Sequence, residues 1–259
     1  MRKRGQITTF IILGIVVLAV VAFFIYMTGV TTKASLERAV PPDVVPIQTF
    51  VDQCVAKTAE YAVVDVSAQG GDYLPDKYIR VGFYDVPYYL YPDPSQQNNI
   101  TLYRTSIDYV QSSLSTYMNR RLSDCVGNLS SFQNEGYSFE FGNVSATALI
   151  LPSKVLFTVD YPIGIAKDNS KSSMQKFSAE VNVPLALMIN ASNEYLDKQS
   201  EALFSFRSGS LLDISYQNGI KSYAGYFGSG NVVVDQVDEN TIINGQPYVY
   251  SFALKYAWI

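Results

Sequence analysis

The chain has 259 residues, a formal net charge of −4, and only 16% charged residues, compared with about 25% in an average soluble domain. It contains no histidine, which excludes histidine-based catalytic triads, H-E-x-x-H zinc sites and histidine-ligated haem. Its length allows one sizeable domain or two small ones.

The N-terminal segment has the pattern of a membrane helix. Arg2, Lys3 and Arg4 open the chain, and residues 5–32 are uncharged. Within them Phe10–Met27 is long enough to cross a hydrocarbon core of about 30 Å. A secretory signal peptide is the alternative, but its apolar core is shorter, and Thr28–Thr32 matches a cleavage site poorly. The residues expected to form this membrane or assembly helix are Phe10, Ile11, Ile12, Leu13, Val16, Val17, Val20, Phe23 and Phe24.

Charge predicts the topology. The three N-terminal cations, against Lys33 alone on the far flank, favour a cytosolic N-terminus and an extracellular remainder. We therefore divide the chain into a basic head and transmembrane helix (1–30), a linker (31–43) and one extracellular domain (44–259). Without its basic head the chain is clearly acidic, which argues against nucleic acid as a partner.

Two apolar stripes of helical spacing predict a pair of packed helices. The first helix is expected to start near Asp43, to carry Cys54 on its buried face and to end at Gly70-Gly71. The second carries Cys125 on its buried face, and its other apolar residues are Ile107, Val110, Leu114, Tyr117, Met118, Leu122 and Val126. An even number of extracellular cysteines predicts a Cys54–Cys125 disulfide, with two buried free thiols as the alternative.

A segment rich in tyrosine and proline lies between these helices. Residues 77–84 alternate in polarity and predict a strand, and the proline-rich remainder predicts a loop. Tyrosine clusters suit protein interfaces or sugar stacking, because the ring is apolar and its tip is polar. The competing interpretation is a half-buried aromatic strand with its loop. The candidate interface residues are Tyr73, Tyr78, Tyr84, Tyr88, Tyr89 and Tyr91.

From Tyr137 onward the periodicity changes from helical to alternating. The predicted strands are Ser138–Asn143, Ser145–Leu151, Val155–Tyr161, Gln175–Val183, Val232–Val237 and Tyr248–Tyr256. A polar loop is expected at Lys167–Ser173, a helix at Leu185–Phe204 and a tight turn at Asn244-Gly245. These elements predict an α+β domain in which two disulfide-linked helices accompany an antiparallel sheet.

Motifs for chemistry are weak. The spacing Gly225-x-x-Gly228-x-Gly230 lacks the context of a dinucleotide site, and Asp235-x-x-Asp238-Glu239 fits a solvated strand end better than a calcium loop. We therefore expect no catalytic residue, no metal and no cofactor. Four sequons favour a glycosylated extracellular surface, at Asn99, Asn128, Asn143 and Asn190.

Two resemblances bear on the type of protein. The opening Lys3-Arg4-Gly5-Gln6 resembles archaeal class III leaders of the type IV pilin kind, although Phe10 stands where those leaders carry glutamate. The chain as a whole is similar to uncharacterised single-pass surface proteins of small-genome (DPANN) archaea. The motifs that carry this second resemblance are Phe50-Val51-x-x-Cys54, Gln69-Gly70-Gly71, Leu122-x-x-Cys125-x-x-Asn128-x-Ser130-x-Phe132, Val159-x-Tyr161-Pro162 and Ile243-Asn244-Gly245-x-Pro247-Tyr248-Val249.

These observations predict a non-enzymatic archaeal cell-surface protein that is anchored in the membrane and acts by self-association or adhesion. Its expected partners are the membrane, further copies of itself, other surface proteins or glycans. One alternative is a pilin-like filament subunit that is processed before Gln6. The other is an extracellular hydrolase that uses carboxylates, which would need two close acidic residues in a deep cleft.

Overall fold

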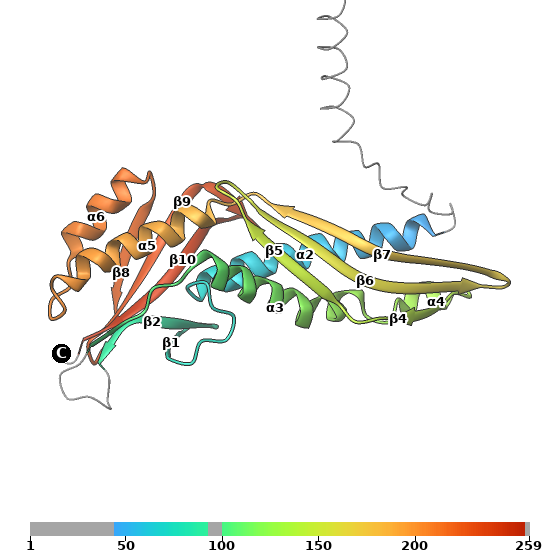
Figure 1. The fold of residues 1–259 in the computed structure, drawn as a ribbon, viewed down its shortest axis with the longest axis horizontal. Helices are drawn as coiled ribbons and strands as arrows, with labels where there is room; N and C mark the ends of the chain where they lie inside the picture. Colours follow the sequence, from blue (N-terminus) through green and yellow to red (C-terminus); the bar gives the residue numbers. More distant parts are fainter. Residues whose placement is uncertain (1–43, 93–99, 257–259) are drawn as a thin grey trace, which may run out of the picture. The chain divides into compact units, whose positions relative to one another are not determined.

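A computed structural model of the chain describes residues 44–92 and 100–256, which belong to one compact unit. Helices and two β-sheets make up this unit, so the predicted α+β class is confirmed (Figure 1). Phe10–Met27 lies outside the described residues. Within the described part of the chain, no helix combines the length and apolar character that a membrane crossing requires.

Helix α2 (Val45–Ala68), the longest helix among the described residues, packs against both sheets. Its buried side chains recur every three or four residues, as the sequence predicted, and include Ile47, Val51, Cys54, Val55, Thr58, Ala62 and Val66. The helix ends as expected, because Gly70 and Gly71 adopt φ values of +56° and +78°. Such left-handed backbone is easily adopted only by glycine.

Helix α3 (Ile107–Val126) packs beside α2 and matches the second predicted stripe. The Oγ atom of Ser106 caps it by accepting a hydrogen bond from the Tyr109 amide at 3.1 Å. A short helix, α4 (Ser130–Gln133), follows, which the sequence pattern did not predict.

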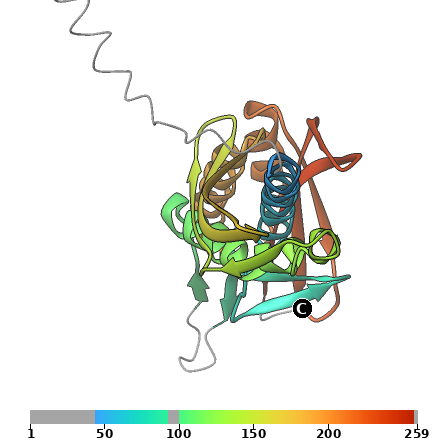
Figure 2. The ribbon, with the colours of Figure 1, turned by 90° about the vertical axis from the view of Figure 1, so that its right-hand side faces the viewer.

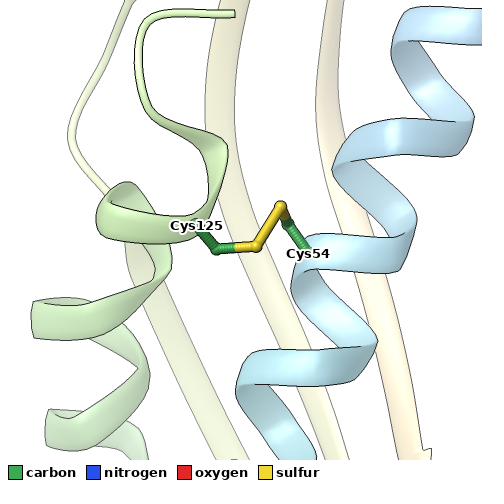
Figure 3. Close-up of a disulfide and its surroundings, with 2 residues drawn as sticks. All are labelled: Cys54 and Cys125. Atoms are coloured by element: carbon green, nitrogen blue, oxygen red, sulfur yellow. A yellow bond between two sulfur atoms is a disulfide. The ribbon is translucent and has the colours of Figure 1, made fainter.

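The predicted disulfide is confirmed, and it joins α2 to α3 (Figure 3). The Cα atoms of Cys54 and Cys125 are 5.6 Å apart, within the usual range for a disulfide. The expectation that both cysteines are buried is wrong for one of them. Cys54 is 4% exposed, but Cys125 is exposed because it lies in the last turn of α3, at the rim of the helix pair.

The first sheet contains β4 (Ser138–Phe141), β5 (Ser145–Ile150), β6 (Val155–Lys167) and β7 (Ser170–Val181). The long strand β6 pairs with β7 on one side and with β4 and β5 on the other, always antiparallel. The predicted loop at Lys167–Ser173 is too long, since β6 and β7 continue to a two-residue turn at Asp168-Asn169. Helix α2 packs against β7, and α3 packs against β5 (Figures 1 and 2).

The second sheet has the order β1 (Tyr78–Val81), β2 (Tyr84–Pro92), β10 (Gln246–Lys255), β9 (Asn231–Ile243) and β8 (Lys221–Tyr226), with β3 (Ile100–Leu102) also paired to β2. The described residues therefore form two sheets, where one antiparallel sheet was expected. Strands β2 and β10 are parallel, whereas the β9–β10 hairpin turns at Asn244-Gly245 as predicted.

The tyrosine- and proline-rich segment differs from its prediction. The expected strand is broken by a turn at Gly82-Phe83, and the expected loop is the strand β2. Pro87 is tolerated because the next amide, that of Tyr88, makes the bond to β1 by donating to the Lys77 carbonyl at 2.9 Å. The missing N–H of Pro87 therefore faces away from β1, and the pairing of β2 with β10 begins only at Tyr88.

Two helices complete the unit. Helix α5 (Leu185–Ser200) is shorter than expected, and α6 (Ser208–Gln217) was not predicted, nor was the exposed edge strand β8. The buried Tyr195 of α5 lies 6.0 Å from the Phe252 ring of β10, so α5 covers one face of the second sheet.

Candidate functional site

Most of the candidate tyrosines gather around the loop from Gln69 to Lys77, which joins α2 to β1. The Gln69 side chain holds this loop in place: its Nε2 donates to the Tyr73 carbonyl at 3.4 Å, and its Oε1 accepts from the Asp85 amide at 3.3 Å. The Leu74 amide donates to Asp72 Oδ1 at 3.0 Å, which closes a local turn. Residues of this loop line two different pockets.

The first pocket, here called the tyrosine groove, has a volume of about 280 Å³. Four tyrosines, two aspartates, one lysine and two prolines line it: Tyr88, Tyr91, Tyr103, Tyr109, Asp72, Asp76, Lys77, Pro75 and Pro87. The rings come from β2, from the segment after β3 and from the first turn of α3. Segments far apart in the sequence therefore meet here.

Hydrogen bonds and ring contacts fix the tyrosine groove. The Tyr109 hydroxyl donates to Asp72 Oδ2 at 2.7 Å, and the Tyr88 hydroxyl donates to Asn231 Oδ1 at 2.9 Å. Tyr103 and Tyr109 meet edge to face with centroids 6.2 Å apart. Lys77 Nζ lies 4.3 Å from the centroid of the Tyr91 ring. These contacts hold the rings in defined orientations before any ligand arrives.

Burial raises the pKa of three phenols in the tyrosine groove. Partial burial raises the pKa of Tyr88 and Tyr103, and at Tyr109 the hydrogen bond to Asp72 raises the pKa further after the effect of burial. A neutral phenol can donate a hydrogen bond, whereas a phenolate cannot. At neutral pH the tyrosine groove therefore offers aromatic faces, hydroxyl groups and carboxylates together.

The second pocket, here called the loop pocket, has a volume of about 340 Å³ and lies between α2, α3 and the β1–β2 turn. Tyr73 and Tyr117 meet edge to face with centroids 5.0 Å apart, and Tyr117 donates to Asp65 Oδ2 at 2.6 Å. Phe83 on the turn is fully exposed at 101%. The other lining residues are Gln69, Leu74, Tyr84 and Arg121.

The six candidate tyrosines have four different placements. Tyr88 and Tyr91 line the tyrosine groove, and Tyr73 and Tyr84 line the loop pocket. Tyr78 is exposed on β1 but lines neither pocket.

Tyr89 needs a correction, because it is fully buried and offers no surface to a partner. Side chains alternate along β2, so Tyr89 points into the core while Tyr88 faces outward. Its hydroxyl donates to the Gly70 carbonyl at 2.7 Å and lies 2.7 Å from the Tyr250 hydroxyl.

Sequence reasoning missed several pocket residues. Tyr103, Tyr109 and Tyr117 lie outside the dense tyrosine segment. Tyr109 reaches the Gln69–Lys77 loop through its hydrogen bond to Asp72, and Tyr117 reaches it through its ring contact with Tyr73. Asp72 could have been predicted to form a local turn, because an aspartate often accepts a hydrogen bond from the amide two residues later. No comparable signal marked Phe83.

Two carboxylates of these pockets, Asp72 and Asp65, orient tyrosine side chains by accepting hydrogen bonds from them. Asp72 accepts bonds at both oxygens, and one Asp65 oxygen accepts from Tyr117, so both residues position tyrosines. Partial desolvation raises the pKa of Asp52, but this residue lines neither pocket. In the described ranges 44–92 and 100–256, no group of three or more His, Cys, Asp or Glu side chains could hold a metal ion.

The remaining predicted features are placed as follows. The sequon asparagines Asn128, Asn143 and Asn190 are exposed, whereas Asn99 and the membrane or assembly helix lie outside the described residues. Asp238 is not solvated as expected, because it is 8% exposed and accepts from the Thr241 hydroxyl at 2.6 Å and from the Asn240 amide at 3.0 Å.

Comparisons with known proteins add no relative. No protein-family model, no curated protein and no solved structure matches this chain.

Proposed function

We propose that this chain is a non-enzymatic cell-surface protein that adheres to carbohydrate through the tyrosine groove and the loop pocket. One observation carries the proposal: seven tyrosines line two pockets that share a single loop, Gln69–Lys77, in their walls. Such a density of amphipathic rings in concave sites is typical of a recognition surface.

Carbohydrate fits this surface better than an anion or a purely apolar ligand. The apolar C–H face of a sugar ring can pack on tyrosine rings, and its hydroxyl groups need both donors and acceptors. The Lys77 ammonium group supplies donors, and Asp76 with Asp72 in the tyrosine groove supplies acceptors. The hydroxyl oxygens of Tyr88 and Tyr109, whose protons are donated to Asn231 and Asp72, can accept further hydrogen bonds. The two aspartates outnumber Lys77, so an anionic ligand is disfavoured in the tyrosine groove.

The experiment is a glycan-array measurement with the full chain in lipid nanodiscs. We expect Tyr91→Ala and Tyr73→Ala each to weaken binding of the selected glycan by about tenfold, because each removes one stacking face. Tyr216→Ala is the matched control, since Tyr216 is 88% exposed on α6 and lines neither pocket. Equal binding by all three variants, or binding to no glycan, would overturn the proposal.

Anchoring belongs to the same proposal. Phe10–Met27 would cross the membrane, with the basic head in the cytosol and residues 44–259 outside. Protease treatment of intact cells should then release the folded domain and leave a short membrane stub. Full protection of the domain would contradict this topology.

A pilin-like subunit is the second candidate, favoured by Gly5-Gln6 and disfavoured by Phe10 in place of glutamate. In that case the N-terminal helix would pack on other helices instead of lipid. Electron microscopy with N-terminal sequencing separates the two: ordered polymers that begin at Gln6 support the pilin, and dispersed particles that begin at Met1 support the anchor.

A further inference from the structure

A third pocket lies apart from the tyrosine groove and has a different character. It has a volume of about 360 Å³ and is enclosed by the C-terminal half of α2, the β1–β2 hairpin and the β9–β10 hairpin. Its wall is mainly aliphatic, with Val64 from α2, Val86 from β2 and Val233 from β9 on different sides. This volume falls within the range of small-molecule sites, about 300–1,000 Å³. We call it the aliphatic pocket.

Strand alternation explains why this side of the second sheet is open. Val234 and Phe252 are directly paired and share the face that α5 covers, since the Phe252 ring contacts Tyr195. Val233 and Asp235 point to the opposite face, as does Ser251, the direct partner of Asp235 across the β9–β10 ladder. The aliphatic pocket is formed on that opposite face.

Two contacts hold the rim of the aliphatic pocket to α2. Lys57 Nζ donates to Asn244 Oδ1 at 2.9 Å at the tip of the β9–β10 hairpin. Nearer the base of the hairpin, Ser67 Oγ lies 2.6 Å from the Tyr248 hydroxyl. The pairing of β9 with β10 shifts between Pro247 and Tyr248, which bends the hairpin at this point. The hairpin is therefore fixed at both ends of the pocket.

One charged group enters this aliphatic wall. Asp235 is the only Asp, Glu, Lys or Arg among the described residues that line the pocket. Its Oδ1 atom accepts a hydrogen bond from Ser251 Oγ at 2.6 Å, which orients the carboxylate and leaves Oδ2 for a further donor. No cationic side chain in the lining neutralises it. The complementary ligand carries a positive charge beside an apolar body.

We propose that the aliphatic pocket binds a small primary ammonium compound, with its ammonium group on Asp235 and its aliphatic body against the valines. The body gains binding free energy by leaving water, and the ammonium group gains a charge-assisted hydrogen bond in a partly dry site. This site is independent of the proposed carbohydrate binding, although Tyr84 borders both the aliphatic pocket and the loop pocket.

The test uses hexylammonium as the probe and the full chain in lipid nanodiscs, with protein-free nanodiscs as the blank. Saturation-transfer NMR and calorimetry should show one saturable site per chain. Asp235→Asn should weaken hexylammonium about tenfold or more, because it removes the charge but can still accept from Ser251. Asp213→Asn is the matched control, because Asp213 is exposed on α6 and lines none of the three pockets.

Further arms separate the possible outcomes. Val64→Trp should fill the aliphatic pocket and abolish probe binding, whereas Tyr73→Ala should weaken glycan binding and leave hexylammonium binding unchanged. Hexanol and hexanoate should bind more weakly than hexylammonium. Two results would overturn the proposal: unchanged binding by Asp235→Asn in a chain that keeps its circular dichroism spectrum, or hexanol binding as tight as that of the ammonium ion.

Discussion

Gly70 and Gly71 connect α2 to the tyrosine groove and the loop pocket. Both have positive φ, and both lie where neighbouring elements approach closely: a Cβ on Gly70 would be 2.6 Å from Pro87 Cγ, and one on Gly71 would be 2.5 Å from Val110 Cγ2. The pair therefore combines a left-handed backbone with contacts to both β2 and α3. These two residues determine where the Gln69–Lys77 loop emerges.

Gly71→Ala tests this role. We expect the free energy of unfolding to fall by about 2–4 kcal/mol, since backbone strain and a steric clash add. Gly82→Ala is the matched control, because Gly82 also has positive φ (+60°) but has no atom near the added Cβ. It should cost only about 1 kcal/mol. Equal losses in urea denaturation would show that packing at Gly71 contributes nothing.

The paired hydroxyls of Tyr89 and Tyr250 predict alkaline sensitivity. Both residues are fully buried, and burial raises both pKa values above the ordinary value of about 10. Above pH 10 the unfolded chain loses these protons while the folded chain retains them, so the stability that is present below pH 10 falls as the pH rises. We expect a decrease of up to about 1.4 kcal/mol per pH unit for each such tyrosine.

This prediction is checked by denaturation at several pH values, with tyrosinate absorbance as the readout. Tyr250→Phe should lower stability at pH 7 by about 1 kcal/mol and make the decline above pH 10 shallower, because one ionising group is gone. An unchanged slope would show that Tyr250 does not cause the alkaline loss.

At the scale of elements, a polar stripe of α3 protects the edge of the first sheet. Gln111, Ser115 and Asn119 accept hydrogen bonds from the amides of Ile150, Ala148 and Ala146 at 2.9, 3.0 and 2.7 Å. Four helical residues advance about 6 Å, and two strand residues advance about 6.6–6.8 Å, so the two repeats match. The helix thereby takes the place of a neighbouring strand on β5.

Ser115→Ala tests this pairing between helix and strand. It leaves the Ala148 amide without its acceptor, so we expect a loss of about 1–3 kcal/mol and faster hydrogen exchange at that amide. The control is Ser112→Ala, an exposed position on the same helix, where a change within about 0.5 kcal/mol is expected. Unchanged exchange at Ala148 would contradict the assignment.

At the scale of the whole described unit, the disulfide ties α2 to α3 across 71 residues of sequence. That interval includes the Gln69–Lys77 loop, the β1–β2 hairpin and β3, and therefore most of the two candidate pockets. Restricting the unfolded chain by a loop of this length is worth about 4 kcal/mol in the chain-entropy treatment. The disulfide therefore stabilises the segments that form the two candidate pockets, although neither cysteine lines them.

The Cys54→Ser/Cys125→Ser double variant should therefore lose about 4 kcal/mol in chemical denaturation. The unaltered chain treated with a reductant should lose the same amount, which controls for the effect of the serines. Mass spectrometry without reductant should show the two cysteine peptides linked. Quantitative alkylation of both thiols under those conditions would rule the bridge out.

Local pattern was sufficient for much of the secondary structure. Helices α2 and α3, six of the strands in approximate form and the Asn244-Gly245 turn all follow from periodicity or turn chemistry, which depend on near neighbours. The disulfide followed from cysteine parity and two helical stripes. Predictions failed where the local pattern was ambiguous. Strand β2 contains prolines, helix α6 is short, and β8 lacks the alternation of buried and exposed residues that marks a strand.

Long-range contacts decided the rest. The sequence pattern did not predict that the strands divide into two sheets or that β2 and β10 pair in parallel. Strand pairing depends on which apolar faces meet in the folded chain, and residues close in sequence do not specify this. The same contacts bring Tyr109 to Asp72, bury Tyr89 while Tyr88 stays accessible, and place Asp235 among valines. The composition of the sequence predicted a tyrosine-rich surface. Only the tertiary structure determined which tyrosines reach that surface, because the burial of a side chain depends on the elements that pack around it.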